Sequence, residues 1–199
     1  MSERNTVARI LHDVGLAAWF GGSLMGAIGV NGASADVDDL RQRARVANAG
    51  WSRWTPVNLL AIGAHVVGGA QIAQANKGRV ASQQGVAAMT AAKTVLTVAA
   101  LGATAYARVL GDKMIKAGDV PVEGGTTPTS TTPAEVAAAQ KQLSALQWVI
   151  PALTGGILAI SAYAGEQQRP SQVAKGVVGR AGQGAAAAAT RVLTLGAGD

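Results

Sequence analysis

The sequence predicts an all-α, polytopic integral membrane protein with four transmembrane helices, packed into a bundle through small residues. Three observations predict this class. Four long windows carry almost no charge, polar segments separate these windows, and 42 of the 199 residues are alanine and 26 are glycine. Aromatic residues make up only 4%, so a soluble core built from this chain would bury little apolar area per residue.

The uncharged windows have the length that a bilayer requires. Residues 14–35, 54–76 and 142–165 carry no formal charge, and residues 80–107 carry only Lys93. A hydrocarbon core about 30 Å thick needs roughly 20 helical residues, whereas soluble amphipathic helices place charges along a wet face. The alternative is an alanine-rich soluble bundle, because the mean hydropathy is only +0.23. We expect helices at about 12–33, 55–76, 83–110 and 133–165.

Helix-start signals and composition set the remaining boundaries. Thr55-Pro56 has the form of an N-cap followed by proline at the first helical position. Residues 132–135 form a capping box before the last helix, and the internal Pro151 is tolerated where neighbouring helices satisfy the freed backbone. We expect a short surface helix at 36–48 and a flexible polar loop, rich in Gly, Thr and Pro, at 118–132.

The chain divides into three parts. Residues 1–13 form the N-terminus, residues 14–165 the four-helix membrane domain, and residues 166–199 a basic tail rich in Ala and Gly. Lys and Arg are shared equally between the two sides, so the positive-inside rule does not decide the orientation. The Thr/Pro-rich loop looks extracytoplasmic, which predicts a multi-pass protein of the cytoplasmic (inner) membrane with both termini in the cytoplasm. Residues 33–35 resemble a signal-peptidase site, but the preceding apolar stretch is long for a signal peptide, so we expect no cleavage there.

Small residues are expected to hold the helices together, because lipid gives no hydrophobic drive for helix association and close backbone approach must supply it. The first helix carries a GxxxG unit, and each of the others has small residues at similar spacing. The expected helix-packing residues are Gly15, Gly22, Gly26, Gly29, Ala64, Gly68, Ala152 and Gly156. Aromatic and basic side chains favour the membrane interface, and the expected anchors are Trp51, Trp54, Trp148 and Arg53.

Ionisable groups inside the windows are the candidate functional residues, because charge in a bilayer is costly. His65 lies near the middle of the second window and Lys93 near that of the third. The alternatives are a histidine hydrogen-bonded between helices and a lysine that snorkels to the headgroups. His12 lies about nine residues, or roughly 13 Å, from the middle of the first helix, so a His12/His65 pair on one haem is geometrically poor. Candidate ligands for haem or copper are His65, Lys93, His12, Met25 and Met89.

Several kinds of chemistry find no support in the sequence. There is no P-loop, no GxSxG and no HExxH motif, and the chain contains no cysteine. We therefore expect no catalytic set and no resident cofactor. The net charge of +6 is confined to narrow bands between uncharged stretches, so we expect membrane lipids and another membrane protein as partners, and no nucleic acid.

One short motif carries a resemblance. The run from His12 to Gly22 has the form H-x6-W-x-G-G and resembles the first-helix signature of copper-resistance-D-like membrane proteins. That resemblance implies copper or haem handling, and it carries over only His12 as a ligand. The whole chain also looks like small four-helix membrane proteins of actinobacteria that have no assigned function.

Three functions follow as hypotheses. The first is a non-enzymatic accessory or stabilising subunit of a larger cytoplasmic-membrane complex, such as an envelope transporter or a respiratory assembly. The second is a haem- or copper-handling redox membrane protein. The third is a small transporter with a polar path near Lys93 and His65.

Overall fold

The computed structural model describes residues 5–83 and 85–166, which are mostly helical. The elements are α1 (Thr6–Met25), the π-helix η1 (Gly26–Val30), α2 (Asn31–Ala35), α3 (Leu40–Ala75), α4 (Lys77–Ser82), α5 (Val86–Ala117), β1 (Val122–Gly124), β2 (Thr127–Pro128) and α6 (Ala134–Glu166). α1, η1 and α2 follow one another without a break and form one long helical segment. The predicted basic tail, apart from its first residue, lies outside the described residues.

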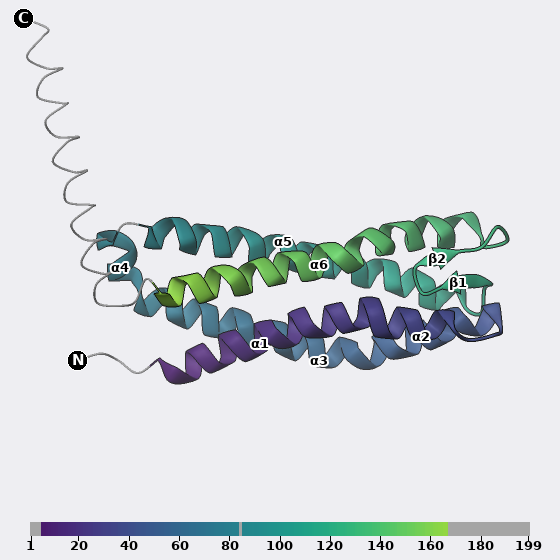
Figure 1. Ribbon diagram of the computed structural model, residues 1–199, viewed down its shortest axis with the longest axis horizontal. Coiled ribbons are helices and arrows are strands. Elements are labelled where there is room, and N and C mark those ends of the chain that lie inside the picture. Colours follow the sequence, from purple (N-terminus) through teal and green to yellow (C-terminus); the bar gives the residue numbers. More distant parts are fainter. Residues whose placement is uncertain (1–4, 84, 167–199) are drawn as a thin grey trace, which may run out of the picture.

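The long helices form an elongated bundle of two layers (Figure 1). α1 and α3 pack along each other in one layer, α5 and α6 pack in the other, and α1 also contacts α6. By contrast, α3 and α5 share few contacts. The start of α1, the short α4 and the end of α6 lie at one end of the bundle, and α2 with the two strands lies at the other (Figure 1).

Four helical segments are long and apolar enough to cross a membrane, by length and composition: Thr6–Ala35, Leu40–Ala75, Val86–Ala117 and Ala134–Tyr163. The predicted number of such helices is therefore confirmed. Large aliphatic side chains cover the outer surface, and Leu59, Leu60 and Val95 are 69%, 77% and 66% exposed. An apolar coat of this kind is typical of a surface that faces lipid or a partner.

Glycine allows α1 and α3 to approach closely. A Cβ atom added at Gly15 would lie 2.7 Å from the backbone nitrogen of His65, and one added at Gly68 would lie 2.5 Å from that of His12. Side chains larger than hydrogen do not fit at these two positions unless the helices separate. Further along the same pair, the rings of Trp54 and Trp51 occupy the space beside Gly22 and Gly26.

The second long helix begins earlier than predicted. The sequence predicts a separate surface helix at 36–48 and a new start at Thr55, but α3 runs unbroken from Leu40 through Pro56. Its N-cap is Asp39, whose carboxylate accepts a hydrogen bond from the backbone N–H of Arg41 at 2.9 Å. The intervening residues include Gly50 and are not strong helix formers, but the rings of Trp51 and Trp54 pack beside Gly26 and Gly22. This tertiary packing continues the helix past the one missing backbone donor at Pro56, and the Thr55 hydroxyl donates to the carbonyl of Trp51.

A β-hairpin stands where the sequence predicts a flexible loop at 118–132. β1 and β2 pair antiparallel, and Val122 is fully buried. Polar side chains of the long helices bind the hairpin backbone. Arg43 of α3 donates to the carbonyl of Glu123 at 2.9 Å, and the buried Gln140 of α6 donates to the carbonyl of Gly124 at 2.9 Å. These long-range contacts supply the order that the local composition does not predict.

Candidate functional site

A cleft of about 370 Å³ separates α3 from α5 and is bounded by α1 and α4. It exists because these two helices pack mainly against other neighbours and hardly against each other. Its polar lining is His12, His65, Asn76, Arg79, Thr90, Lys93, Thr94 and Thr97. Its apolar lining includes Val66, Ala70, Ala73, Val86, Met89, Val98 and Leu101. The cleft therefore gathers four of the five candidate ligands, and Met25 lies outside it.

The two histidines lie against each other in this cleft. Their ring centroids are 4.4 Å apart, and the planes are tilted by 42°. The predicted separation along the membrane normal is therefore wrong. α3 reaches back to Leu40 at the hairpin end, so the middle of its segment moves toward the hairpin and His65 lies away from it. His12, His65 and Lys93 each lie about eight residues from the middle of their segments, or about 12 Å at 1.5 Å per residue.

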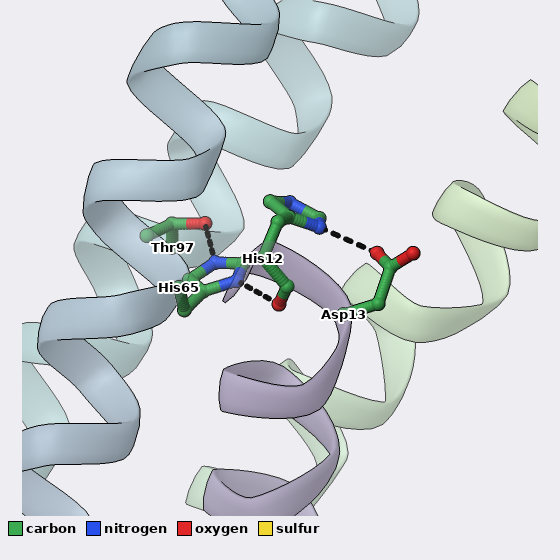
Figure 2. A network of polar contacts seen from close by, with 4 residues as sticks. All are labelled: His12, Asp13, His65 and Thr97. Atoms are coloured by element: carbon green, nitrogen blue, oxygen red, sulfur yellow. Dashed lines mark hydrogen bonds and ion pairs between the residues drawn. The ribbon is translucent and has the colours of Figure 1, made fainter. Parts of the chain in front are cut away.

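Backbone and side-chain hydrogen bonds orient both rings (Figure 2). His65 Nδ1 donates to the backbone carbonyl of His12 at 3.1 Å, and its Nε2 faces the hydroxyl of Thr97 at 3.5 Å. His12 Nδ1 donates to the carboxylate of Asp13 at 2.7 Å. The His12 side chain is only 7% exposed, whereas that of Asp13 is 65% exposed. A buried imidazole is thus linked to a carboxylate on the outer surface of α1.

One face of α5 supplies the opposite wall. Thr90, Lys93, Thr94 and Thr97 recur at helical spacing and all line the cleft. The Thr90 and Thr94 hydroxyls donate to carbonyls one turn back in their own helix. Lys93 is the only formally charged residue in the charge-poor part of α5. It lies one helical turn from Thr97, whose hydroxyl faces His65 Nε2.

A buried tryptophan lies next to the histidine pair. Trp19 is fully buried, and its ring centroid is 6.1 Å from that of His65. Its Nε1 donates to the Thr104 hydroxyl of α5 at 3.2 Å. Leu16, Ala100, Ile150 and Ile157 form a buried core cluster with Trp19. None of these core residues lines the cleft, whose lining on α5 ends at Leu101.

The lining offers positive charge and hydrogen-bond donors. The side chains of Asp and Glu are missing from it within the described part of the chain, while Lys93 and Arg79 are present. Among residues 5–83 and 85–166, no group of three or more His, Cys, Asp or Glu side chains is placed to hold a metal ion. The tilted contact between the histidine rings also leaves no room for a porphyrin plane between them.

The predicted packing residues fall into two groups. Gly15, Gly22, Gly26, Ala64 and Gly68 lie between α1 and α3, and a Cβ at Gly156 would contact Leu96 of α5 at 3.5 Å. By contrast, a Cβ at Gly29 would meet only Met25 of its own helix, and Ala152 is exposed.

The predicted interface anchors are also divided. Trp51 packs against α1, and its Nε1 donates to Asn31 Oδ1 at 2.9 Å. Trp54 packs beside it, whereas Trp148 is 52% exposed and Arg53 is exposed. Both packed tryptophans lie well inside α3 and not at a helix start, because α3 begins at Leu40. Their role as anchors stays a prediction.

Sequence reasoning missed several members of the site. Arg79 and Asn76 hydrogen-bond each other across the start of α4, and Arg79 also donates to Gln83. Asn76 ends the second uncharged window, and Arg79 lies in the polar break that follows it. Thr90, Thr94 and Thr97 were also not predicted as site residues, although they recur with Lys93 at helical spacing, a signal that could have found the α5 wall.

Comparisons with family models, curated proteins and solved structures give no match for this chain. The resemblance to copper-resistance-D-like membrane proteins therefore stays a prediction.

Proposed function

We propose that this chain is a small transporter of the cytoplasmic membrane whose ligand path includes the cleft between α3 and α5. The observation that carries the proposal is the cleft itself. It places a lysine, two histidines and three threonines inside segments that are otherwise apolar enough to span a membrane. Intramembrane ionisable residues that face a cavity are characteristic of substrate and ion pathways.

The shape of the cleft supports a path that is open from one side. It reaches from Asn76 and Arg79 at the end of the bundle inward to Thr97 and Leu101. Past this lining, Trp19 of α1 donates a hydrogen bond to Thr104 of α5. A carrier must close one side of its site while the other is open, and parting of Trp19 from α5 is the movement that transport through this bundle would require. We place both termini in the cytoplasm, so the cleft opens toward that side.

Thiol labelling tests whether the cleft holds water. The chain has no cysteine, so single cysteine variants have no background. Thr97→Cys places a thiol in the cleft. Val95→Cys is the matched control, because Val95 lies two residues away in the same helix, is 66% exposed and does not line the cleft. In membrane vesicles, a charged methanethiosulfonate reagent should label the Thr97→Cys variant at least about tenfold faster.

The side from which labelling occurs completes the test. A reagent that cannot cross the membrane should label the Thr97→Cys variant from the cytoplasmic side, where we place α4 and the start of α1. Equal slow labelling of both variants would mean that the cleft is dry and would overturn the transporter proposal. A thermal-unfolding midpoint close to that of the parent chain shows that each variant is folded.

A second function, that of an accessory subunit in a larger membrane complex, has its own supporting observation. α5 is the least covered of the four segments: only 6% of its most apolar window is buried, against 33% for the first segment. Its exposed face carries small residues, and nothing lies within 4 Å of a Cβ added at Gly102. Small exposed residues permit the close helix approach that partners use in lipid.

This second function is tested by purification in a mild detergent from the native membrane. A stoichiometric partner that is lost on Gly102→Ile, and kept on the control Gly63→Ile in α3, would support the accessory role. Gly63 also has nothing within 4 Å of an added Cβ, so both substitutions are equally tolerated within the bundle. A chain that runs alone in both forms would count against this role.

A further inference from the structure

The chemistry of the cleft lining identifies the class of ligand, and this inference rests on the proposed ligand-binding role of the cleft. We propose that the cleft between α3 and α5 binds a single-chain amphiphile with an oxyanion headgroup, such as a fatty-acid carboxylate or a monoacyl phosphate. Positive charge at Lys93 and Arg79 meets the headgroup, and the apolar residues of α3 and α5 cover the chain.

Charge complementarity favours an anion. Lys93 and Arg79 both line the cleft, and no carboxylate lines it within residues 5–83 and 85–166. Asp13, the nearest acidic residue to the histidines, accepts a hydrogen bond from His12 and turns outward, with 65% of its side chain exposed. The cleft therefore offers an oxyanion two cationic side chains, Lys93 and Arg79, as partners. An oxyanion in a region of low dielectric gains more from such partners than it does in water.

The rim of the cleft favours a ligand that arrives from the lipid. Val66 and Val98 line the cleft and are also 41% and 63% exposed. They belong to α3 and α5 respectively, so an apolar edge stands on each side of the opening. A purely hydrophilic anion would have to cross this edge, whereas the chain of an amphiphile is stabilised by contact with it.

Size limits the ligand to one chain. The volume of about 370 Å³ lies at the low end of the range of roughly 300–1,000 Å³ that is typical of ligand pockets. It suits a headgroup with the upper part of one acyl chain.

Protection of a cleft thiol tests the ligand class. Thr97→Cys in nanodiscs of neutral phospholipid is labelled with a charged methanethiosulfonate reagent while oleate, oleoyl phosphate, methyl oleate or oleylamine is added. We expect oleate, oleoyl phosphate or both to slow labelling at least about fivefold, and methyl oleate and oleylamine to have little effect. The stronger of the two anions identifies the headgroup as carboxylate or phosphate.

Lysine variants make the test specific. Thr97→Cys combined with Lys93→Met should lose the protection, and combination with Lys93→Arg should keep it. Lys113→Met is the matched control, since it removes a lysine from the same helix outside the cleft. If the anions do not protect a thiol that is readily labelled, or if methyl oleate protects it equally, the ligand class is wrong while the water-filled cleft stands. A thiol that is not labelled at all refutes the proposed function as well.

Discussion

Replacement of Gly68 by alanine tests the close approach of α1 and α3, on which the geometry of the histidine pair depends. The added Cβ would lie 2.5 Å from the backbone nitrogen of His12, whereas real Cβ contacts stay above 3.0 Å. The two helices must therefore separate by at least about half an ångström, because the clash is with backbone that cannot rotate away. Overpacking of this kind costs about 1–3 kcal/mol.

Gly63→Ala is the matched control. Gly63 lies in the same helix, and an added Cβ there meets nothing within 4 Å. Both substitutions gain about 1 kcal/mol of helix propensity, so that gain cancels when the two variants are compared. We therefore expect the Gly68→Ala variant to be less stable than the Gly63→Ala variant by about 1–3 kcal/mol.

The assay is reversible unfolding in mixed micelles of a mild detergent and SDS, followed by circular dichroism and tryptophan fluorescence. Gly15→Ala strains the same crossing through His65. The double variant should therefore lose less stability than the sum of the two single variants, because one separation of the helices relieves both clashes. Equal stabilities of the Gly68→Ala and Gly63→Ala variants would refute the close crossing.

Three further predictions concern other contacts. Trp19→Phe and Thr104→Val should each lower the stability of the bundle. A double-mutant cycle of the two should give a coupling free energy of about 0.6 kcal/mol, the average for interhelical hydrogen bonds in membranes. A coupling of zero would mean that the two side chains do not form a hydrogen bond. Gln140→Leu removes the donor to the buried carbonyl of Gly124, so amide exchange in the hairpin should accelerate while that in α5 stays unchanged. The backbone hydrogen bond that its carboxylate accepts lowers the pKa of Asp39 from its ordinary 3.8, so its capping of α3 is present above that pH and is lost as the pH falls through the lower pKa of the folded state. Asp39→Asn should keep the cap and remove this pH dependence, which NMR of the first turn of α3 measures.

The number of long apolar helices could be predicted from the sequence because it depends on local properties. The absence of charge over about 20 consecutive residues can be recognised in the sequence without knowledge of the fold. The four charge-poor windows correspond to the four helical segments. The start of α6 at Ala134 was also accessible, since Pro133 and the residues around it form a local signal. These features need no knowledge of which helices touch.

The extent of α3 and the hairpin could not be predicted, because both depend on contacts between distant residues. Thr55-Pro56 is a valid start signal in isolation, but the packing of Trp51 and Trp54 beside glycines of α1 and η1 continues the helix that Asp39 caps. The hairpin is held by Arg43 and Gln140, and their local sequence gives no sign of that role.

The candidate site shows the same division. His65 and Lys93 were recognised because a polar group in an apolar window is conspicuous. The sequence did not predict that these residues lie close to His12, because the depth of a residue in the bundle depends on where its helix begins. The predicted start of the second helix at Thr55 put His65 at its middle, but α3 begins at Leu40, which moves His65 to about the same distance from the middle of its segment as His12.

Native mass spectrometry of the protein, released from its own membrane in a mild detergent, tests the central claim most directly. We predict one small anionic amphiphile bound per chain, retained in the Lys113→Met variant and lost in the Lys93→Met variant. A chain that carries no such ligand, or one that keeps it equally in both variants, would contradict the assignment of the α3–α5 cleft as the ligand site.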